Sequence, residues 1–235
     1  MWPARLPAPA MTEDAFEEAL EAGIAMEERL DWEGALTHYT SLLAGLRTSA
    51  VKDAAWQARL ASAEMRRANA LMVLRRMDDA RAAFDASLDA AKASGDPLVS
   101  ARALLGAGVF AGSSGDPSRA EEFLLQALER FSRMGSDDGR QGLGWALLNL
   151  GGLYGKTGRL DLAFVTLGKA REALFAIRNW VGVATAWEVQ AQLRRAMGDE
   201  ERWREDLAEA VVFYDRQGMP EKSAALRETL KGTLV

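Results

Sequence analysis

The single histidine, His38, is the first side chain in this sequence to consider for chemistry. One imidazole could act as a general acid or base, but it cannot form a two-histidine zinc site. It precedes Tyr39 within a predicted helix, where a surface or packing role is expected. The chain also has no cysteine, which excludes thiolate metal ligands, thiol nucleophiles and disulfides. We therefore expect no catalytic residue and no metal site.

Two glycine-containing segments have the composition of catalytic or phosphate-binding loops, but not their spacing. Gly112-Ser113-Ser114-Gly115 does not have the pattern of a nucleophile elbow and falls where a turn is expected. Gly139, Gly142 and Gly144 follow no predicted strand, and no Lys-Ser or Lys-Thr pair follows them. The sequence thus predicts neither an enzyme nor a cofactor.

A turn signal followed by a small residue or its equivalent recurs along the chain. The residues that end this signal are Ala35, Ala80, Ala120, Ala163 and Trp203, which follow one another at intervals of 40–45 residues. A period in the range of ~20–50 residues is typical of stacked-repeat proteins. Such arrays usually present an extended binding surface rather than one catalytic pocket.

The repeated segments are predicted to be helical, because Ala, Leu, Arg and Glu dominate and alternating strand patterns are absent. Thr12, followed by acidic residues, is the expected N-cap of the first helix. The expected helix pairs cover residues 12–29 and 32–49, 51–75 and 77–94, 97–113 and 117–134, 139–157 and 160–177, and 180–197 and 200–217. Pro220 opens a last helix to about residue 231, which would cap the end of the stack.

The fourth pair carries a resemblance to a known family. Leu147, Leu150-Gly151, Tyr154, Ala163 and Leu167 stand at the offsets of the tetratricopeptide repeat signature. Weaker matches occur in the other pairs, with Gly23, Ala35 and Tyr39 in the first. The repeats are longer than the usual 34 residues, which resembles the long-helix members of the family. The resemblance implies an all-α, right-handed superhelical solenoid of five helix pairs with a capping helix, and one repeat domain over residues 12–217.

In the resembled family, the first helix of each pair lines a concave groove. Transferred position by position, the resemblance implies a groove with an apolar centre and polar flanks. Its residues would be Met65, Asn69, Met72, Arg102, Leu105, Val109, Trp145, Leu148, Gly152, Lys156, Gln192 and Arg195. Apolar residues occupy the position where family members that capture a terminal carboxylate have lysine, so that mode of binding is not expected. Alternatively, the longer helices rotate these side chains into packing between repeats.

Charge and composition limit the partners. The net charge of −5 argues against a nucleic-acid surface, and no apolar run is long enough for a membrane span or a signal peptide. Residues 12–33 hold nine acids and one base, while residues 52–76 hold six bases and two acids, which suggests neutralisation across a helix seam. Residues 1–11 are expected to be a disordered leader, and residues 218–235 the capping helix and tail. A cytoplasmic location fits the absence of cysteine.

Three functional hypotheses follow from the sequence. The first is a non-enzymatic adaptor that binds a peptide or helix of another protein in its concave groove. The second is a regulatory module that senses a small ligand or signalling peptide. The third is self-association into a homo-oligomer through the outer face or the last helix.

Overall fold

The computed structural model describes residues 11–232, which form helices joined by short turns. The chain divides into two compact units, with unit 1 ending at Gly115 and unit 2 starting at Asp116. The helices of unit 1 are α1 (Glu13–Glu28), α2 (Trp32–Arg47), α3 (Ala54–Val73), α4 (Met77–Ser94) and α5 (Pro97–Ser113). Those of unit 2 are α6 (Pro117–Ser132), α7 (Asp137–Lys156), α8 (Leu160–Ala176), α9 (Trp180–Ala196), α10 (Glu200–Arg216) and α11 (Pro220–Lys231).

This architecture confirms the all-α prediction, and the helix limits differ from the expected ones by at most three residues. The right-handed superhelix and the single continuous repeat domain over residues 12–217 stay predictions. The expected leader falls mostly on residues 1–10, outside the described part of the chain. Met11 is described, and its carbonyl accepts a hydrogen bond from Arg59 Nη1 at 3.0 Å.

Side-chain caps explain where many of the helices begin. Thr12 Oγ1 accepts from the Ala15 amide at 3.3 Å, which confirms it as the N-cap of α1. Aspartates cap several later helices in the same way. For example, Asp53 Oδ1 accepts a hydrogen bond from the backbone amide of Trp56 at 2.8 Å. Each cap satisfies an amide that has no partner inside its helix.

Left-handed residues end many of the helices. Gly158 and Gly198 adopt φ near +76°, and the amide of the following residue reaches back five positions to a helix carbonyl. Leu30, between α1 and α2, and Arg75, between α3 and α4, occupy the same place although they have side chains, with φ of 60° and 62°. This backbone conformation is what the recurring turn signal encodes.

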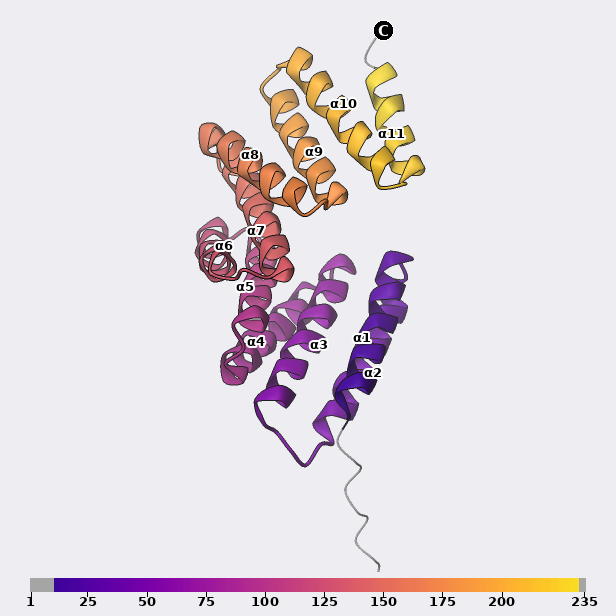
Figure 1. Cartoon of the computed structure of the whole chain (residues 1–235), viewed down its shortest axis with the longest axis vertical. Helices are drawn as coiled ribbons and strands as arrows, with labels where there is room; N and C mark the ends of the chain where they lie inside the picture. The colour runs from indigo at the N-terminus through magenta and orange to yellow at the C-terminus, as the bar shows by residue number, and fades with distance from the viewer. Residues whose placement is uncertain (1–10, 233–235) are drawn as a thin grey trace, which may run out of the picture. The chain divides into compact units, whose positions relative to one another are not determined.

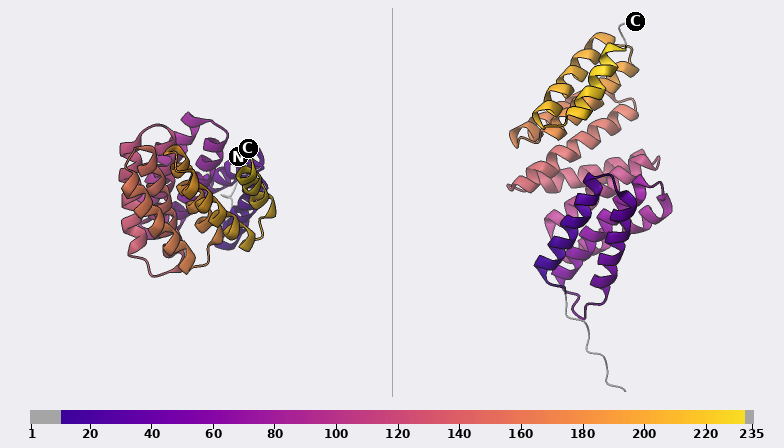
Figure 2. Two further views of the ribbon diagram at one scale, coloured as in Figure 1. Left: turned by 90° about the horizontal axis from the view of Figure 1, so that it is seen from above. Right: turned by 90° about the vertical axis from the view of Figure 1, so that its right-hand side faces the viewer.

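In unit 1, the first helices of successive pairs contact one another, whereas no comparable contact joins α2 to α4 (Figures 1 and 2). α3 touches both α1 and α5, and packs most extensively against α4. Gly23 lies directly against the ring of buried Tyr39, as the repeat pattern implies. The small residue lets α1 and α2 approach closely, and the large one fills the space beside it.

In unit 2, α7 packs against α6, α8 and α9, and α11 packs on α10. Figure 1 shows α9, α10 and α11 side by side. The pairing of a small with a large residue recurs here, because a Cβ on Gly151 would lie 2.8 Å from Leu167 Cγ. Leu226 and Leu230 of α11 cover buried Trp203 and Leu207, so this helix shields the apolar face of α10.

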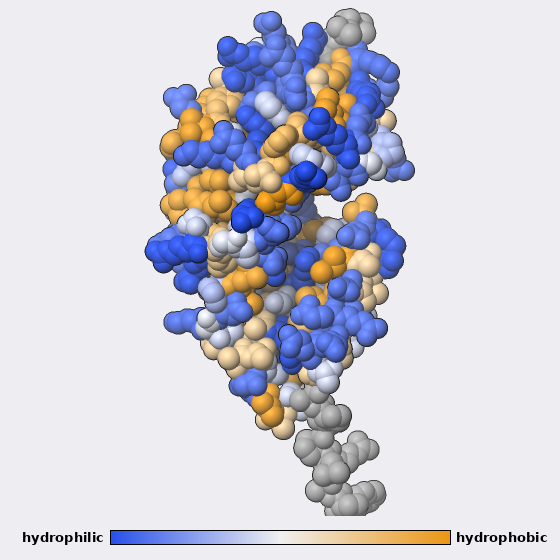
Figure 3. All heavy atoms as spheres, in the orientation of Figure 1, coloured by the Kyte–Doolittle hydropathy of each residue, from blue (hydrophilic) through white to orange (hydrophobic). Residues whose placement is uncertain are grey.

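The punctuating residues of the repeat are all buried. Ala35, Ala80 and Ala163 have no exposed surface, and Ala120 and Trp203 are almost completely covered. On the face drawn in Figure 3, hydrophobic residues form small groups between hydrophilic ones in both units. The core of each unit therefore lies between its helices, where the repeat pattern placed it.

Candidate binding surfaces

The predicted groove residues of unit 1 lie on α3 and α5, two first helices in mutual contact. Met65 and Met72 are half-buried and pack beside the core around Phe84. Met65 also reaches α5, because its Cγ lies 3.4 Å from where a Cβ of Gly106 would be. Leu105 and Val109 are half-buried.

Two polar candidates lie on the same helices. Asn69 on α3 is half-buried, and Arg102 on α5 is exposed. The α3 and α5 candidates together, here called the unit 1 face, therefore combine partly accessible apolar side chains with an amide and a guanidinium. Methionine suits such a surface because its unbranched side chain adapts to irregular partners.

In unit 2 the predicted residues separate into two groups. Leu148 is buried in the core cluster with Leu174 and Val183, and it therefore lies in packing rather than on an open surface. Trp145 is half-buried and packs against the same cluster. By contrast, Lys156 is exposed.

The two candidates on α9, Gln192 and Arg195, are also exposed. The guanidinium carbon of Arg195 lies 4.9 Å from the centre of the Trp203 ring. Lys156 lies on α7 and this pair lies on α9, and the two helices contact each other. They give the first helices of unit 2 a polar and basic character.

The glycines of α7 differ in what lies beside them. The nearest side-chain atom to a Cβ on Gly152 would be Val189 Cγ1 at 3.8 Å, so there is room next to this residue. Gly155, three residues further along α7, is covered by the side chain of Leu193 from α9. The open space along this part of α7 is therefore limited to Gly152, because α9 approaches α7 closely at Gly155.

The glycines that resembled a phosphate loop are inside α7. Gly142 lies against the ring of Phe131, and a Cβ on Gly144 would meet Leu174 Cγ at 2.5 Å. Both glycines are buried and serve the close packing of α7 against α6 and α8. The packing role of these glycines was not predicted, because the large apolar residues that they face, Phe131 and Leu174, lie on other helices.

His38 makes a structural contact. Its Nε2 lies 2.6 Å from the Ala19 carbonyl oxygen of α1, and its ring meets Tyr39 edge to face. This contact ties α2 to α1. Within residues 11–232, no group of three or more His, Asp or Glu side chains is placed to hold a metal ion.

The charged segments of unit 1 meet at one ion pair. Arg66 Nη1 on α3 lies 2.9 Å from Glu27 Oε2 on α1, and Tyr39 donates to the other oxygen of Glu27 at 2.8 Å. Burial, together with the carboxylate of Glu27, raises the pKa of Tyr39. Part of the charge segregation is thus neutralised between α1 and α3.

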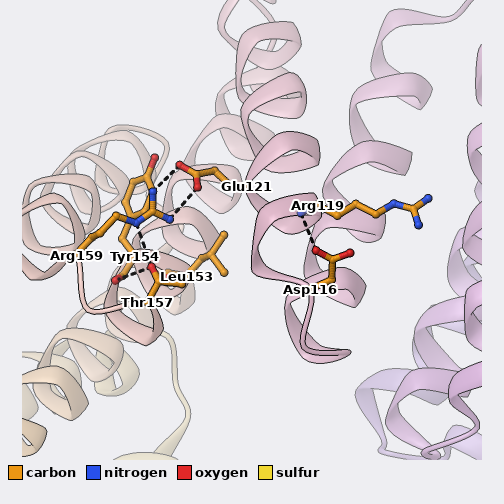
Figure 4. A network of polar contacts seen from close by, with 7 residues as sticks. All are labelled: Asp116, Arg119, Glu121, Leu153, Tyr154, Thr157 and Arg159. Atoms are coloured by element: carbon orange, nitrogen blue, oxygen red, sulfur yellow. Dashed lines mark hydrogen bonds and ion pairs between the residues drawn. The ribbon is translucent and has the colours of Figure 1, made fainter.

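A second ion pair fixes the start of α8 in unit 2 (Figure 4). Arg159 donates from Nη1 and Nη2 to the two oxygens of Glu121, each at 2.8 Å, while its guanidinium covers Tyr154 at 4.3 Å. The hydrogen bonds from Arg159 hold the pKa of the Glu121 carboxyl below its ordinary value. A bidentate pair has fixed geometry, so it sets the position of the turn between α7 and α8 against α6.

Sequence reasoning missed a hollow in unit 2. It has a volume of about 440 Å³ and is lined by Arg171, Glu172, Phe175, Ala176, Val183, Trp187, Glu209 and Phe213. These residues come from α8, α9 and α10, and α9 packs against both of the others. The signal available in the sequence was the aromatic residue Phe175, which lies beyond the repeat signature of the fourth pair.

Comparisons with known proteins agree with this architecture. Residues 59–133 match the tetratricopeptide repeat family. No curated protein sequence matches the chain. The solved structures that it resembles include BtubC (BKLC) from P. vanneervenii, with 19% identity, coverage of 87% of this chain and 82% of that one, and a TM-score of 0.66.

Two further solved structures share the fold. Bacillus thuringiensis PlcR, crystallised with the peptide PapR7 and DNA, is 12% identical, with 91% of this chain and 74% of that chain covered and a TM-score of 0.72. TPR-like repeats from Podosopora anserina are 13% identical, with 86% and 96% covered and a TM-score of 0.62.

The helix pairs with their small-to-large contacts define a helical repeat protein. The matched segment, residues 59–133, identifies these helix pairs as tetratricopeptide-type repeats. Within the described residues, no helix combines the length and the apolar character needed to cross a membrane.

Proposed function

We propose that the protein is a non-enzymatic adaptor that binds a peptide or helix of a partner protein on the concave side of its first helices. The observation that carries this proposal is the unit 1 face, where half-buried Met65 and Met72 share α3 with polar Asn69 and half-buried Val109 lies on the neighbouring α5. A cytoplasmic location, and partners other than nucleic acid or membranes, are part of the proposal.

Contacts between helices support the choice of this side. Because α1, α3 and α5 contact in succession while α2 and α4 do not, the first helices form the continuous surface of unit 1. A continuous surface of partly exposed apolar side chains can give a peptide apolar contact, and the amide can fix its orientation. In unit 2, the exposed Lys156, Gln192 and Arg195 lie on α7 and α9, where Gly152 also leaves open space.

A selection from a phage-displayed peptide library tests the proposal without a known partner. Selected peptides are titrated by calorimetry against the wild type, against Val109→Glu on α5, and against Ala82→Glu on the exposed side of α4. We expect Val109→Glu to weaken binding at least about tenfold, because a charge would face apolar contacts, while Ala82→Glu binds normally. An empty selection, or equal affinity in all three proteins, would rule the proposal out.

A peptide-sensing regulatory module is a second candidate. PlcR, which shares the fold, was crystallised with a peptide and DNA. In a sensor, peptide binding should change the conformation, so hydrogen exchange of helices away from the peptide would change on binding. In a simple adaptor, protection would be confined to the contacted helices.

A further inference from the structure

The hollow over α9 has a preformed aromatic floor. The guanidinium carbon of Arg171 lies 3.7 Å from the centre of the Trp187 ring, and Arg171 Nη1 donates to Gln190 Oε1 at 2.6 Å. Gln190 in turn donates to buried Asp206 at 2.8 Å. This chain of contacts links α8, α9 and α10 and holds Trp187 in place.

The wall of the hollow is aromatic and partly open to solvent. Phe175 is 50% exposed although its ring contacts Trp180 at 5.3 Å and Phe213 at 6.2 Å between centres. The Phe213 and Trp180 rings are stacked, with Arg216 over both, so the wall is already ordered. Ordered aromatic side chains lose little conformational entropy when a partner binds.

The mouth of the hollow is acidic. Glu172 on α8 and Glu209 on α10 are exposed, and within the described residues neither has a hydrogen bond or an ion pair. Arg171, the one cation among the lining residues, is already engaged with Gln190 and lies in the field of Asp206 and of both glutamates. Among the lining residues, the two charged side chains without a hydrogen bond are therefore both negative, while Arg216, outside the lining, lies over the Phe213 ring.

We propose that this hollow is a second docking site of unit 2, and that its occupant is a basic amphipathic segment of a partner protein. A large apolar side chain of the segment enters against Trp187, Phe175 and Phe213. A lysine or arginine beside it pairs with Glu172 or Glu209. The volume lies within the range of ~300–1,000 Å³ found for ligand sites, which is enough for an apolar anchor.

Two matched probes test the sign of the charge. They are fluorescein-labelled amphipathic peptides, one built from leucine and lysine and the other with each lysine replaced by glutamate. We expect the leucine–lysine peptide to bind the full chain, with an affinity that falls as salt is added, and the leucine–glutamate peptide not to bind. Equal binding of the two peptides would overturn the proposal.

Variants then locate the site. Glu172→Gln with Glu209→Gln should weaken the leucine–lysine peptide at least about tenfold, whereas Glu122→Gln with Glu129→Gln on α6 should not. Ala176→Trp fills the hollow and should block binding, while Ala82→Trp on α4 adds the same bulk elsewhere. Circular dichroism confirms that each variant is folded.

The outcomes decide between the hollow and general attraction to an acidic protein. If the α6 pair weakens binding as much as the α8–α10 pair, or if Ala176→Trp binds like the wild type, the hollow is not the site. Val109→Glu is expected to leave this binding unchanged, because it alters only the unit 1 face.

Discussion

Leu193 of α9 occupies the space beside Gly155 of α7, so the helix-to-helix contact depends on the absence of a side chain at that position. One turn earlier, Gly152 has no such neighbour, because a Cβ added to it would lie 3.8 Å from the nearest side-chain atom, Val189 Cγ1. Gly155 therefore permits close packing of α9 on α7, whereas Gly152 leaves open space beside the helix.

Alanine substitutions at the two positions should differ in sign. Gly152→Ala is expected to stabilise the fold by up to about 1 kcal/mol, because alanine is the better helix former. Gly155→Ala has the same helical benefit but forces Leu193 to move, which we expect to cost ~1–3 kcal/mol. Urea unfolding of the two variants measures the difference, and equal stabilities would contradict the observed contact.

The turns allow a stabilising change. Arg75 adopts φ of 62° at the place where Gly158 and Gly198 stand in later turns. Replacing Arg75 with glycine should raise the free energy of unfolding by about 0.5–1 kcal/mol, since a left-handed conformation is strained for residues with a Cβ. Gly158→Ala is the matched reverse change and should lower stability. Thermal melting of the two variants gives the sign of each effect.

Much of this fold could be predicted from the sequence because its signals are local. A cap such as Thr12, a turn residue such as Gly158 and the buried Ala163 each act within one or two helix turns. The state of Gly155 could not be predicted in this way. It depends on how closely α9 approaches, and the side chain responsible lies in the next repeat.

The candidate site was harder to predict for the same reason. The repeat register placed Leu148 on a groove-lining position, but in unit 2 it contributes to the core with Leu174. A helical pattern gives the face of a residue but not the crossing angle that determines what covers it. The hollow at Trp187 went unrecognised because its lining comes from three helices.

Buried Asp206 makes the stability of unit 2 depend on pH. Burial raises its pKa above the ordinary 3.8, and this outweighs the hydrogen bond from Gln190 and the attraction of Arg194 and Arg171. Between the unfolded and folded pKa values, the native state binds more protons than the unfolded chain. The contribution of Asp206 is therefore fully favourable below 3.8 and is lost as pH rises through the folded pKa.

Asp206→Asn tests this sign. Asparagine keeps a side-chain oxygen that can accept the hydrogen bond from Gln190, and the asparagine side chain does not ionise. The free energy of unfolding of the variant, relative to the wild type, should therefore increase as pH rises above 3.8 towards neutrality. Urea unfolding over a pH series measures this difference, and a difference that falls with rising pH would show that the carboxylate is stabilising.

Ala163 tests the repeat register itself. It has no exposed surface at the contact of α8 with α7, so Ala163→Leu should over-pack the seam and cost ~1–3 kcal/mol. The loss should extend to neighbouring helices, because repeats stabilise one another. Ala208→Leu on the exposed side of α10 is the control. Hydrogen exchange follows the spread, and an unchanged melting temperature for Ala163→Leu would argue against the register.

Trp145 and Gly152 separate binding from packing in unit 2. Trp145 is half-buried against the core cluster, so Trp145→Ala should lower stability by ~1–3 kcal/mol, less than the ~3–5 kcal/mol of a fully buried tryptophan. A loss of affinity in that variant would therefore not separate binding from packing, because the fold is also destabilised.

Gly152→Leu is the cleaner change, since the space beside Gly152 is open and leucine favours a helix. We expect it to melt at or above the wild-type temperature and yet to weaken a partner bound along α7 about tenfold or more by steric exclusion. Calorimetric titration with a peptide selected on the wild type measures the affinity, with the exposed Ala208→Leu as the control. If Gly152→Leu binds with unchanged affinity, the partner does not use this part of α7, and binding would be confined to the unit 1 face.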